Sequence, residues 1–357
     1  MTQPTTPEQP APAGDARTTV MRSILGGMAA QVVATTTKLG IADALGESTV
    51  HAADLAQRCD VSVQPMRRLL RALAALGLCA EQHPDQFALT EAGGLLRRDH
   101  PRSLHGFARM FTDPAMLGAW NHLDTAVHTG EPQFAEIFGV PFFDHLAGQP
   151  ELSALFNASM SQATRAVAAS LPDHYNFDRY SVVADVGGGD GSLLSAILTR
   201  NAHLRGFVYD TPEGAAQAVD TISAAELSDR CDVVHGDFFH HIPAGADLVL
   251  LKSILHDWND DAAGTILHNC HAVLPEHGRL LIIEPVLPEV VPEDARAGIY
   301  LSDLNMLVNI GGRERTSAEF TELCERSGFA ITRIDPLPQH VGFFLIEAAP
   351  EPVVTPS

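Results

Sequence analysis

The sequence predicts an α/β protein in which a mostly helical segment precedes a doubly wound parallel sheet. The first observation is a series of short apolar stretches after Tyr180 that alternate with helical ones: VVADV, GFVYD, DVVHGD, DLVLLKS and RLLIIEP. Wholly apolar strands separated by helices are typical of a parallel sheet whose two faces are both covered by helices. The second observation is that apolar residues recur at helical spacing through residues 21–77, which indicates a helical domain before the sheet.

The helical segment begins with a stripe of apolar side chains over residues 21–40, at three- and four-residue spacing. A short helix, a turn and a longer helix follow. The stretches Cys79–Glu81 and Gln86–Leu89 then have the pattern of two strands of a wing. We therefore predict a winged-helix domain over residues 19–100.

A winged helix has two common uses. It can bind DNA through its second helix, which here carries Gln64, Arg67, Arg68 and Arg71. It can instead serve as a packing and dimerisation element. The chain has 23 Lys and Arg against 44 Asp and Glu, a formal charge of -21, and such a charge repels nucleic acid and anionic lipid. We therefore predict dimerisation and no nucleic-acid partner.

The other domain limits follow from composition. Residues 1–18 and 349–357 are rich in Pro, Thr and Ala without apolar periodicity, and we predict that they are disordered tails. Residues 101–175 are predicted to be a helical linker with Phe and Met side chains for a substrate pocket, and residues 176–348 to form the α/β domain. The five cysteines are scattered and no stretch resembles a signal peptide or membrane span, so we expect a cytoplasmic protein without a membrane partner.

The strand VVADV runs directly into a glycine-rich turn and then a helix. Gly187 and Gly189 lie in this turn, where the backbone can approach a ligand closely. The glycines alternate after Asp185, whereas a nicotinamide fingerprint counted from Gly187 would need a glycine at Ser192. The Asp185 carboxylate would repel a pyrophosphate but accept a cationic amino-acid group. These features favour S-adenosylmethionine, and a small oxidoreductase is the weaker alternative.

The next strands also end in residues suited to a ligand, at the edge where open α/β sheets bind them. Asp210 closes GFVYD and suits ribose hydroxyls. Asp237 and Phe238, in HGDFF, suit an adenine amino group and ring. His256 follows the next strand in LLKSILHDW. Because it lies on the same rim, we predict that it is a catalytic histidine.

Six motifs occur in order behind the winged-helix segment: DVGGGDG, YD, GDFF, LKSILHDW, IIEPVLP and GGRERT. Together they closely resemble the S-adenosylmethionine-dependent O-methyltransferases of the plant caffeic-acid type and of bacterial antibiotic pathways. The resemblance spans essentially the whole predicted folded chain. It implies a Rossmann-like methyltransferase domain, a homodimer formed through the N-terminal domains and a small aromatic substrate of secondary metabolism.

The resemblance also implies roles for individual residues. His256 matches the general base, and Glu284 and Glu314 match the two glutamates that flank and orient it. Lys252 and Ser253 match positions near the cofactor. The residues that match the surroundings of the methyl donor and acceptor are Phe156, Met160, Asp257, Met306 and Asn309.

The predicted chemistry is simple. Methyl transfer from a sulfonium to a hydroxyl, expected to be phenolic, needs aligned partners and one base, and it leaves S-adenosylhomocysteine. A histidine of pKa near ~6.5 can remove the proton of a phenol of pKa near ~10 when carboxylates stabilise the imidazolium. We expect no metal, and we predict that His240 and His241 form a solvated rim.

Besides the oxidoreductase, two alternatives to methyl transfer remain. The first is a homologue that keeps S-adenosylmethionine but catalyses decarboxylation, hydroxylation or cyclisation. The second is a ligand-responsive transcriptional regulator, which the acidic charge disfavours.

Overall fold

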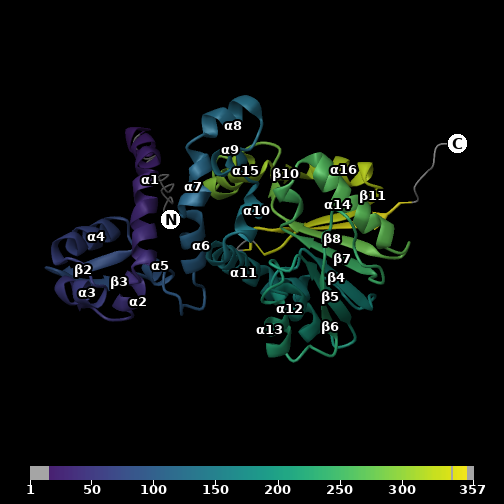
Figure 1. Cartoon of the computed structure of the whole chain (residues 1–357), viewed down its shortest axis with the longest axis horizontal. Helices are drawn as coiled ribbons and strands as arrows, with labels where there is room; N and C mark the ends of the chain where they lie inside the picture. The colour runs from purple at the N-terminus through teal and green to yellow at the C-terminus, as the bar shows by residue number, and fades with distance from the viewer. Residues whose placement is uncertain (1–15, 339–340, 352–357) are drawn as a thin grey trace, which may run out of the picture. The chain divides into compact units, whose positions relative to one another are not determined.

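The computed structural model describes residues 16–338 and 341–351. The chain divides into two compact units, Met1–Thr112 and Asp113–Ser357, which Figure 1 shows in purple to blue and in blue to yellow. Hydrophobic clusters form separately within each unit, so each unit is described by itself.

The two predicted tails are partly structured. Helix α1 (Ala16–Lys38) begins inside the first tail, and strand β12 (Phe344–Pro350) extends into the second. Residues 1–15 and 352–357 of these tails lie outside the described residues. No helix in the described part of the chain has the length and apolar character needed to cross a membrane.

The first unit is the predicted helical domain with a wing. Its elements after α1 are α2 (Ile41–Leu45), β1 (Val50–His51), α3 (Ala52–Arg58), α4 (Val63–Ala75), β2 (Cys79–His83), β3 (Gln86–Leu89), α5 (Glu91–Gly94) and α6 (His105–Phe111). The strands form an antiparallel sheet in the order β1-β3-β2. Leu55, Leu70 and Phe87 are fully buried between the helices and this sheet, because apolar residues at helical spacing on α3 and α4 face the wing.

On helix α4, two of the three arginines at the positions that a DNA-binding helix would use, Arg67 and Arg71, are paired with carboxylates, whereas Arg68 is exposed. The Arg67 guanidinium donates to Asp85 Oδ1 at 2.6 Å, and Arg71 lies 3.2 Å from Glu81 Oε1. Both carboxylates belong to the wing hairpin. This pairing supports the packing interpretation of the winged helix over DNA binding.

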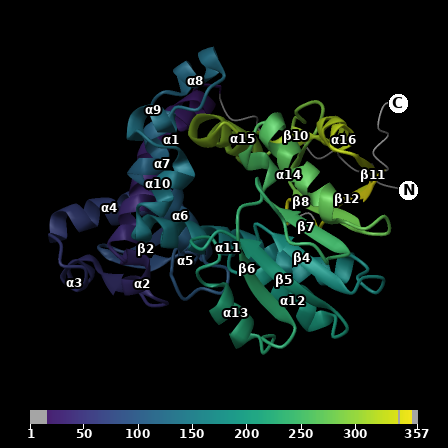
Figure 2. The ribbon, with the colours of Figure 1, turned by 45° about the vertical axis from the view of Figure 1, so that its right-hand side comes forward.

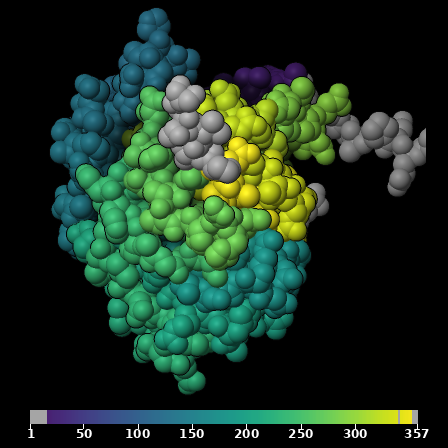
Figure 3. Space-filling view, turned by 90° about the vertical axis from the view of Figure 1, so that its right-hand side faces the viewer, coloured from purple at the N-terminus to yellow at the C-terminus, as the bar shows by residue number. Residues whose placement is uncertain are grey.

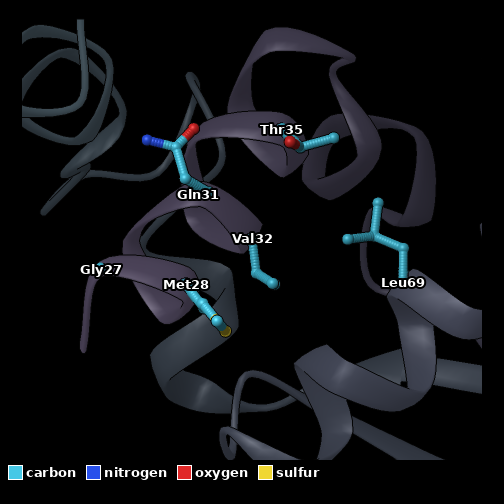
Figure 4. A pocket seen from close by; sticks show the side chains of 6 residues that line it. All are labelled: Gly27, Met28, Gln31, Val32, Thr35 and Leu69. Atoms are coloured by element: carbon cyan, nitrogen blue, oxygen red, sulfur yellow. The ribbon is translucent and has the colours of Figure 1, made fainter. Parts of the chain in front are cut away.

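Helix α1 keeps a large part of its apolar stripe exposed. Ile24 is 66% and Met28 69% exposed. Met28 and Val32 point into an open hollow that Leu69 of α4 lines from the other side (Figure 4). A stripe of this kind on a helix normally packs against another apolar surface.

The second unit begins with five helices: α7 (Pro114–Trp120), α8 (Leu123–Thr129), α9 (Phe134–Phe138), α10 (Phe142–Ala147) and α11 (Pro150–His174). Proline is tolerated at the first turns of α7 and α11 because its missing N–H has no partner there. The long helix α11 then leads into the sheet.

The sheet has seven strands in the order β11-β12-β8-β7-β4-β5-β6. In chain order its strands are β4 (Val182–Val186), β5 (Arg205–Asp210), β6 (Cys231–His235), β7 (Leu248–Lys252), β8 (Arg279–Glu284), β11 (Phe329–Pro336) and β12. Strands β8, β7, β4, β5 and β6 are parallel, whereas β12 and β11 run antiparallel at one edge. The predicted doubly wound α/β domain is therefore confirmed.

Two hydrophobic cores lie on opposite faces of this sheet. Helices α11, α12 (Ser192–Arg200) and α13 (Ala218–Ala224) cover one face, and α14 (Asp260–Val273) and α16 (Ser317–Arg326) cover the other (Figure 2). Neighbouring residues of one strand enter different cores, as Leu250 and Leu251 of β7 do. The alternation follows from the two-residue period of a strand.

The remaining elements lie at the carboxyl ends of the parallel strands. They are the 3-10 turn η1 (Leu255–Asp257), β9 (Val286–Leu287), α15 (Ala297–Ile310) and β10 (Arg315–Thr316). Strand β11 forms one lateral edge of the sheet, with β12 beside it. Figure 3 shows the yellow C-terminal part of the chain at the surface beside green segments.

Candidate active site

The glycine-rich turn after β4 has the conformation that its glycines allow. Gly187, Gly189 and Gly191 have φ angles of 70°, 56° and 73°, a region that other residues rarely adopt. A Cβ at Gly187 would overlap the side chain of Ile254. The turn therefore needs glycine both for its backbone shape and for close packing.

Asp185 lies below this turn and lacks a partner for one oxygen. The residue is 1% exposed, and its Oδ2 has no hydrogen bond to the described residues. Burial, together with the negative charge of Asp210, raises the pKa of Asp185 to about 7. A buried carboxylate oxygen without a donor is costly, so this oxygen is suited to a cationic or N–H ligand group.

Helix α11 contributes side chains to the same region. Lys252, at the end of β7, donates through Nζ to Thr164 Oγ1 at 3.0 Å, and burial lowers the pKa of this lysine to about 8. Ser161 donates to Asp190 Oδ2 at 2.6 Å in the glycine-rich turn. Ser161 and Thr164 were not predicted as site residues, because no motif in the neighbouring sequence marks them.

Three predicted cofactor residues, the last residue of β5 and two residues just after β6, have different surroundings. The Asp210 carboxylate accepts from Gly189 N at 2.9 Å, and burial raises its pKa. Asp237 is half exposed and pairs with His240 Nδ1 at 2.8 Å. The side chain of His240 is 83% exposed, as expected of a rim. Phe238 contacts the ring of Trp258.

His256 lies on η1, directly beyond the end of β7, and carboxylates surround its ring. Its Nδ1 lies 3.1 Å from Glu314 Oε1 and 3.6 Å from Glu284 Oε2. Its Nε2 lies 3.5 Å from Asp257 Oδ1. The structure thus brings the predicted base and both predicted glutamates together from three separate segments.

The two glutamates make different contacts. Glu284 is fully buried, and its Oε1 accepts from the backbone N–H groups of Ile254 and Leu255 at 2.9 Å and of His256 at 3.4 Å. Glu314 accepts from His256 Nδ1 and, at 3.0 Å, from Ser302 Oγ. Glu284 therefore holds the backbone of the turn, whereas Glu314 fixes the ring and its tautomer.

The carboxylates control the protonation of His256. Burial alone would lower the pKa of the ring, but the charges of Glu284, Asp257 and Glu314 outweigh burial and raise it to about 10. Burial raises the pKa of Asp257 to about 7, against the opposing effect of His256. The imidazolium form is consequently well stabilised.

His256, Glu284 and Glu314 also place one potential metal-ligand atom each within 4.8 Å of one another. The sequence does not reveal this grouping, because the three residues come from different motifs. Hydrogen bonds occupy His256 Nδ1 and Glu284 Oε1. The expectation that no metal takes part stays a prediction.

Aromatic and amide side chains lie near the η1 turn that carries His256. The rings of Phe156 and Trp258 both contact Phe143, at 6.2 and 5.6 Å between centroids. On α15, Met306 and Asn309 are buried. Met160 is half-buried on α11.

Two further residues extend this group. Asn305 Oδ1 accepts from both Trp120 Nε1 and Asn309 Nδ2, at 2.9 and 3.0 Å. Trp120 and Asn305 were not predicted as site residues, because their contact spans 185 positions.

Comparison with known proteins places this geometry in a family. A model of the O-methyltransferase dimerisation domain matches residues 21–99, and one of the O-methyltransferase domain matches residues 120–330. The O-demethylpuromycin-O-methyltransferase of Streptomyces alboniger is 43% identical over 93% of this chain and 88% of its own length. Aclacinomycin 10-hydroxylase of Streptomyces purpurascens is 36% identical over 85% of this chain and 81% of its own.

The folds agree as well. The structure of the O-methyltransferase NcsB1 from neocarzinostatin biosynthesis, in complex with S-adenosyl-L-homocysteine and 1,4-dihydroxy-2-naphthoic acid, has a TM-score of 0.79 and 32% identity. The match covers 95% of this chain and 100% of that one. Because both family models match and the relatives are this similar in sequence, this chain belongs to the O-methyltransferase family.

Proposed function

We propose that this protein is an S-adenosylmethionine-dependent O-methyltransferase that methylates a phenolic hydroxyl of a small aromatic secondary metabolite, with His256 as general base. The observation that carries the proposal is the arrangement at the carboxyl edge of the sheet. There His256, whose side chain is largely but not fully buried, donates through Nδ1 to Glu314 Oε1 at 3.1 Å. Its Nε2 is thereby left for an acceptor hydroxyl.

The residues of the chain suit the cofactor. Asp185 has a buried oxygen without a hydrogen-bond partner in the described part of the chain, which an ammonium group can satisfy. The glycine turn exposes backbone without side chains, and Asp210, Asp237 and Phe238 supply acceptors and a ring along the neighbouring strand ends. Lys252 and Ser253 complete this set. S-adenosylmethionine, when bound, supplies a methyl group already activated by a sulfonium.

The chain's own part in the reaction is to orient the acceptor and remove its proton. His256 Nδ1 donates to Glu314, so neutral His256 presents an unprotonated Nε2 that can accept the phenolic proton. The carboxylates then stabilise the imidazolium. Because the pKa of His256 is raised to about 10, little neutral imidazole exists at pH 7 before substrates bind, and we expect the reaction to accelerate as the pH rises.

The surroundings of the turn support a flat aromatic acceptor. Phe156, Met160 and Met306 supply apolar surface, while Asp257 and Asn309 supply polar groups beside it. Aromatic rings and thioethers pack well on planar ligands. The antibiotic-pathway names of the relatives support the same class of acceptor.

A homodimer belongs to the proposal. The exposed side chains of Ile24, Leu25 and Met28 on α1, and the hollow beside them in Figure 4, form an apolar face that a second copy can bury. The match to a dimerisation domain over residues 21–99 supports it.

The test is incubation with S-adenosylmethionine and a panel of phenolic aromatic compounds, followed by mass spectrometry for a methylated product and S-adenosylhomocysteine. His256→Ala should abolish methylation while S-adenosylhomocysteine still binds. The matched control is His277→Ala. This histidine is exposed and precedes the N-terminal end of β8, whereas Glu284 lies at the C-terminal end. Hydroxylated products without S-adenosylhomocysteine would instead support an activity like that named for the aclacinomycin hydroxylase, and decarboxylated products would support another reaction without methyl transfer.

A further inference from the structure

Arg315 is a fully buried arginine in the first strand position of β10. Its Nε and Nη2 donate to Asp260 Oδ1 at 3.0 and 2.8 Å. Its Nη1 donates to the carbonyl of Leu255 at 2.8 Å, and its Nη2 to the carbonyl of Trp258 at 2.9 Å. A buried guanidinium is unfavourable unless its donors are satisfied, and here all three nitrogens have partners.

The two carbonyls that Arg315 holds lie on either side of the catalytic residues. Leu255 precedes His256, and Trp258 follows Asp257, so the guanidinium spans the η1 turn from one end to the other. Between them, the carbonyl of His256 accepts from the backbone N–H of Arg313 at 2.8 Å. The segment that contains Glu314 thus binds three of the turn's carbonyls.

The N–H groups of the same turn are held from a different strand. Glu284, at the end of β8, accepts from the backbone N–H groups of Ile254, Leu255 and His256. Strands β9 and β10 pair in parallel with Arg315 opposite Val286, so the two holding segments are themselves joined. The carbonyl groups and the N–H groups of the turn are therefore held by two segments that are hydrogen-bonded to each other through β9 and β10.

The GGRERT segment packs so closely on the η1 turn that a side chain at Gly312 has no room. A Cβ at Gly312 would overlap the carbonyl oxygen of His256 and the backbone of Asp257. The backbone of the GGRERT segment consequently lies directly against the catalytic turn. A small change in this segment must move the turn, because main-chain atoms cannot be displaced as the end of a flexible side chain can.

We infer that Arg315 is a positioning residue for His256: its fork holds the carbonyls of Leu255 and Trp258 and thereby keeps the imidazole within hydrogen-bond distance of Glu314. The catalytic meaning of this inference rests on the proposed function. Arg315 touches neither the ring of His256 nor any residue proposed to contact the cofactor through its side chain, as far as the described residues show. Its effect must pass through the backbone of the turn.

The first variant is Arg315→Lys, which keeps the positive charge but cannot donate to two carbonyls and a carboxylate in a planar fork. We expect kcat to fall about 10- to 100-fold, the range for a displacement of about 1 Å at a catalytic group. The acceptor KM and the affinity for S-adenosylhomocysteine should stay within about twofold, since the cofactor turn after β4 is untouched.

The decisive second readout does not depend on turnover. The titration of His256 is followed by NMR of the histidine side chains, with the signals assigned by comparison with His256→Gln. In Arg315→Lys we expect the pKa of His256 to fall from its raised value toward the ordinary ~6.5, because the bond to Glu314 weakens. The matched control is Arg326→Lys, because Arg326 is an exposed arginine of α16 that lies 3.9 Å from Asp261 of α14, the residue next to Asp260.

The outcomes separate the inference from the proposed function. If Arg315→Lys binds S-adenosylhomocysteine normally and shows the parental titration and kcat, the inference is wrong. If cofactor affinity, thermal stability and kcat fall together, the role is structural and the inference is also wrong. If Arg315→Lys does not fold, Asp260→Asn decides by the same titration. If the parent methylates nothing, the proposed function fails, while the NMR result still tests the positioning.

Discussion

Glu314→Gln offers a direct test of how the carboxylates control His256. Glutamine has nearly the same shape, and its amide oxygen can still accept from His256 Nδ1 and Ser302 Oγ, which lie at 3.1 and 3.0 Å from Glu314 Oε1. The substitution therefore removes a charge rather than a contact. A hydrogen bond to a charged group contributes about 1.5–3 kcal/mol, and a neutral one about 0.5–1.5 kcal/mol.

The difference is roughly 1–2 kcal/mol, or about one pKa unit. Negative charge beside the ring favours imidazolium, so its removal lowers the pKa of His256 from about 10 to roughly 9. At pH values below the pKa of the variant, the fraction of neutral His256 is about tenfold higher in the variant than in the parent. At every pH, the imidazolium formed in the reaction is less stabilised in the variant, which lowers the rate of the neutral form about tenfold. The two effects nearly cancel at pH 7.

The assay is kcat/KM for the acceptor between pH 6 and 10.5, for the parent and Glu314→Gln. We expect similar values at neutral pH, an acidic limb displaced to lower pH in the variant, and a plateau about tenfold below the parental rate. An equal reduction at every pH, with the same apparent pKa, would refute the reasoning. It would show that Glu314 acts through shape alone.

Three further predictions use other parts of the molecule. Asp185→Asn should weaken S-adenosylmethionine binding at pH 8 about 10- to 100-fold in calorimetry. Binding to the parent should weaken as the pH falls below 7, because protonation removes the charge of a carboxylate whose pKa is about 7. Equal affinities of the two proteins at pH 8 would contradict this prediction. Gly206→Ala would place a Cβ 2.5 Å from the carbonyl oxygen of Val183 on the neighbouring strand. The substitution should lower the free energy of unfolding by about 1–3 kcal/mol, measured by denaturation. The control is Gly94→Ala, whose new Cβ meets no atom within 4 Å. Ile24→Glu should convert the proposed dimer to a monomer in light scattering, and an unchanged dimer mass would argue against α1 as the interface.

The sequence predicts the fold well where burial repeats with a period. The apolar strands and the helical stripes of the first unit follow from residue patterns of two and three to four positions. The strand-end residues Asp185, Asp210 and His256 follow as well, because the carboxyl ends of parallel strands meet at one edge. These predictions need only local patterns and the topology.

Other features need contacts that no local pattern contains. Glu284 and His256 are predicted as a pair by resemblance, but the use of Glu284 Oε1 on the backbone of the turn depends on the register between β7 and β8. Likewise, the bonds from α11 to Lys252 and from Trp120 to Asn305 join residues 88 and 185 positions apart. Side-chain geometry at that separation is set by packing, not by periodicity.

The way in which the catalytic turn is held also bears on how acceptor range can change. Its anchors are side chains on β8 and β10 that bind main-chain groups of the turn, whereas the apolar side chains proposed to face the acceptor come from α11 and α15. Exchange of Phe156 or Met306 therefore leaves these anchors in place. Libraries randomised at those two positions should yield many folded, cofactor-binding variants, so that directed evolution can search for new phenols without rebuilding the base.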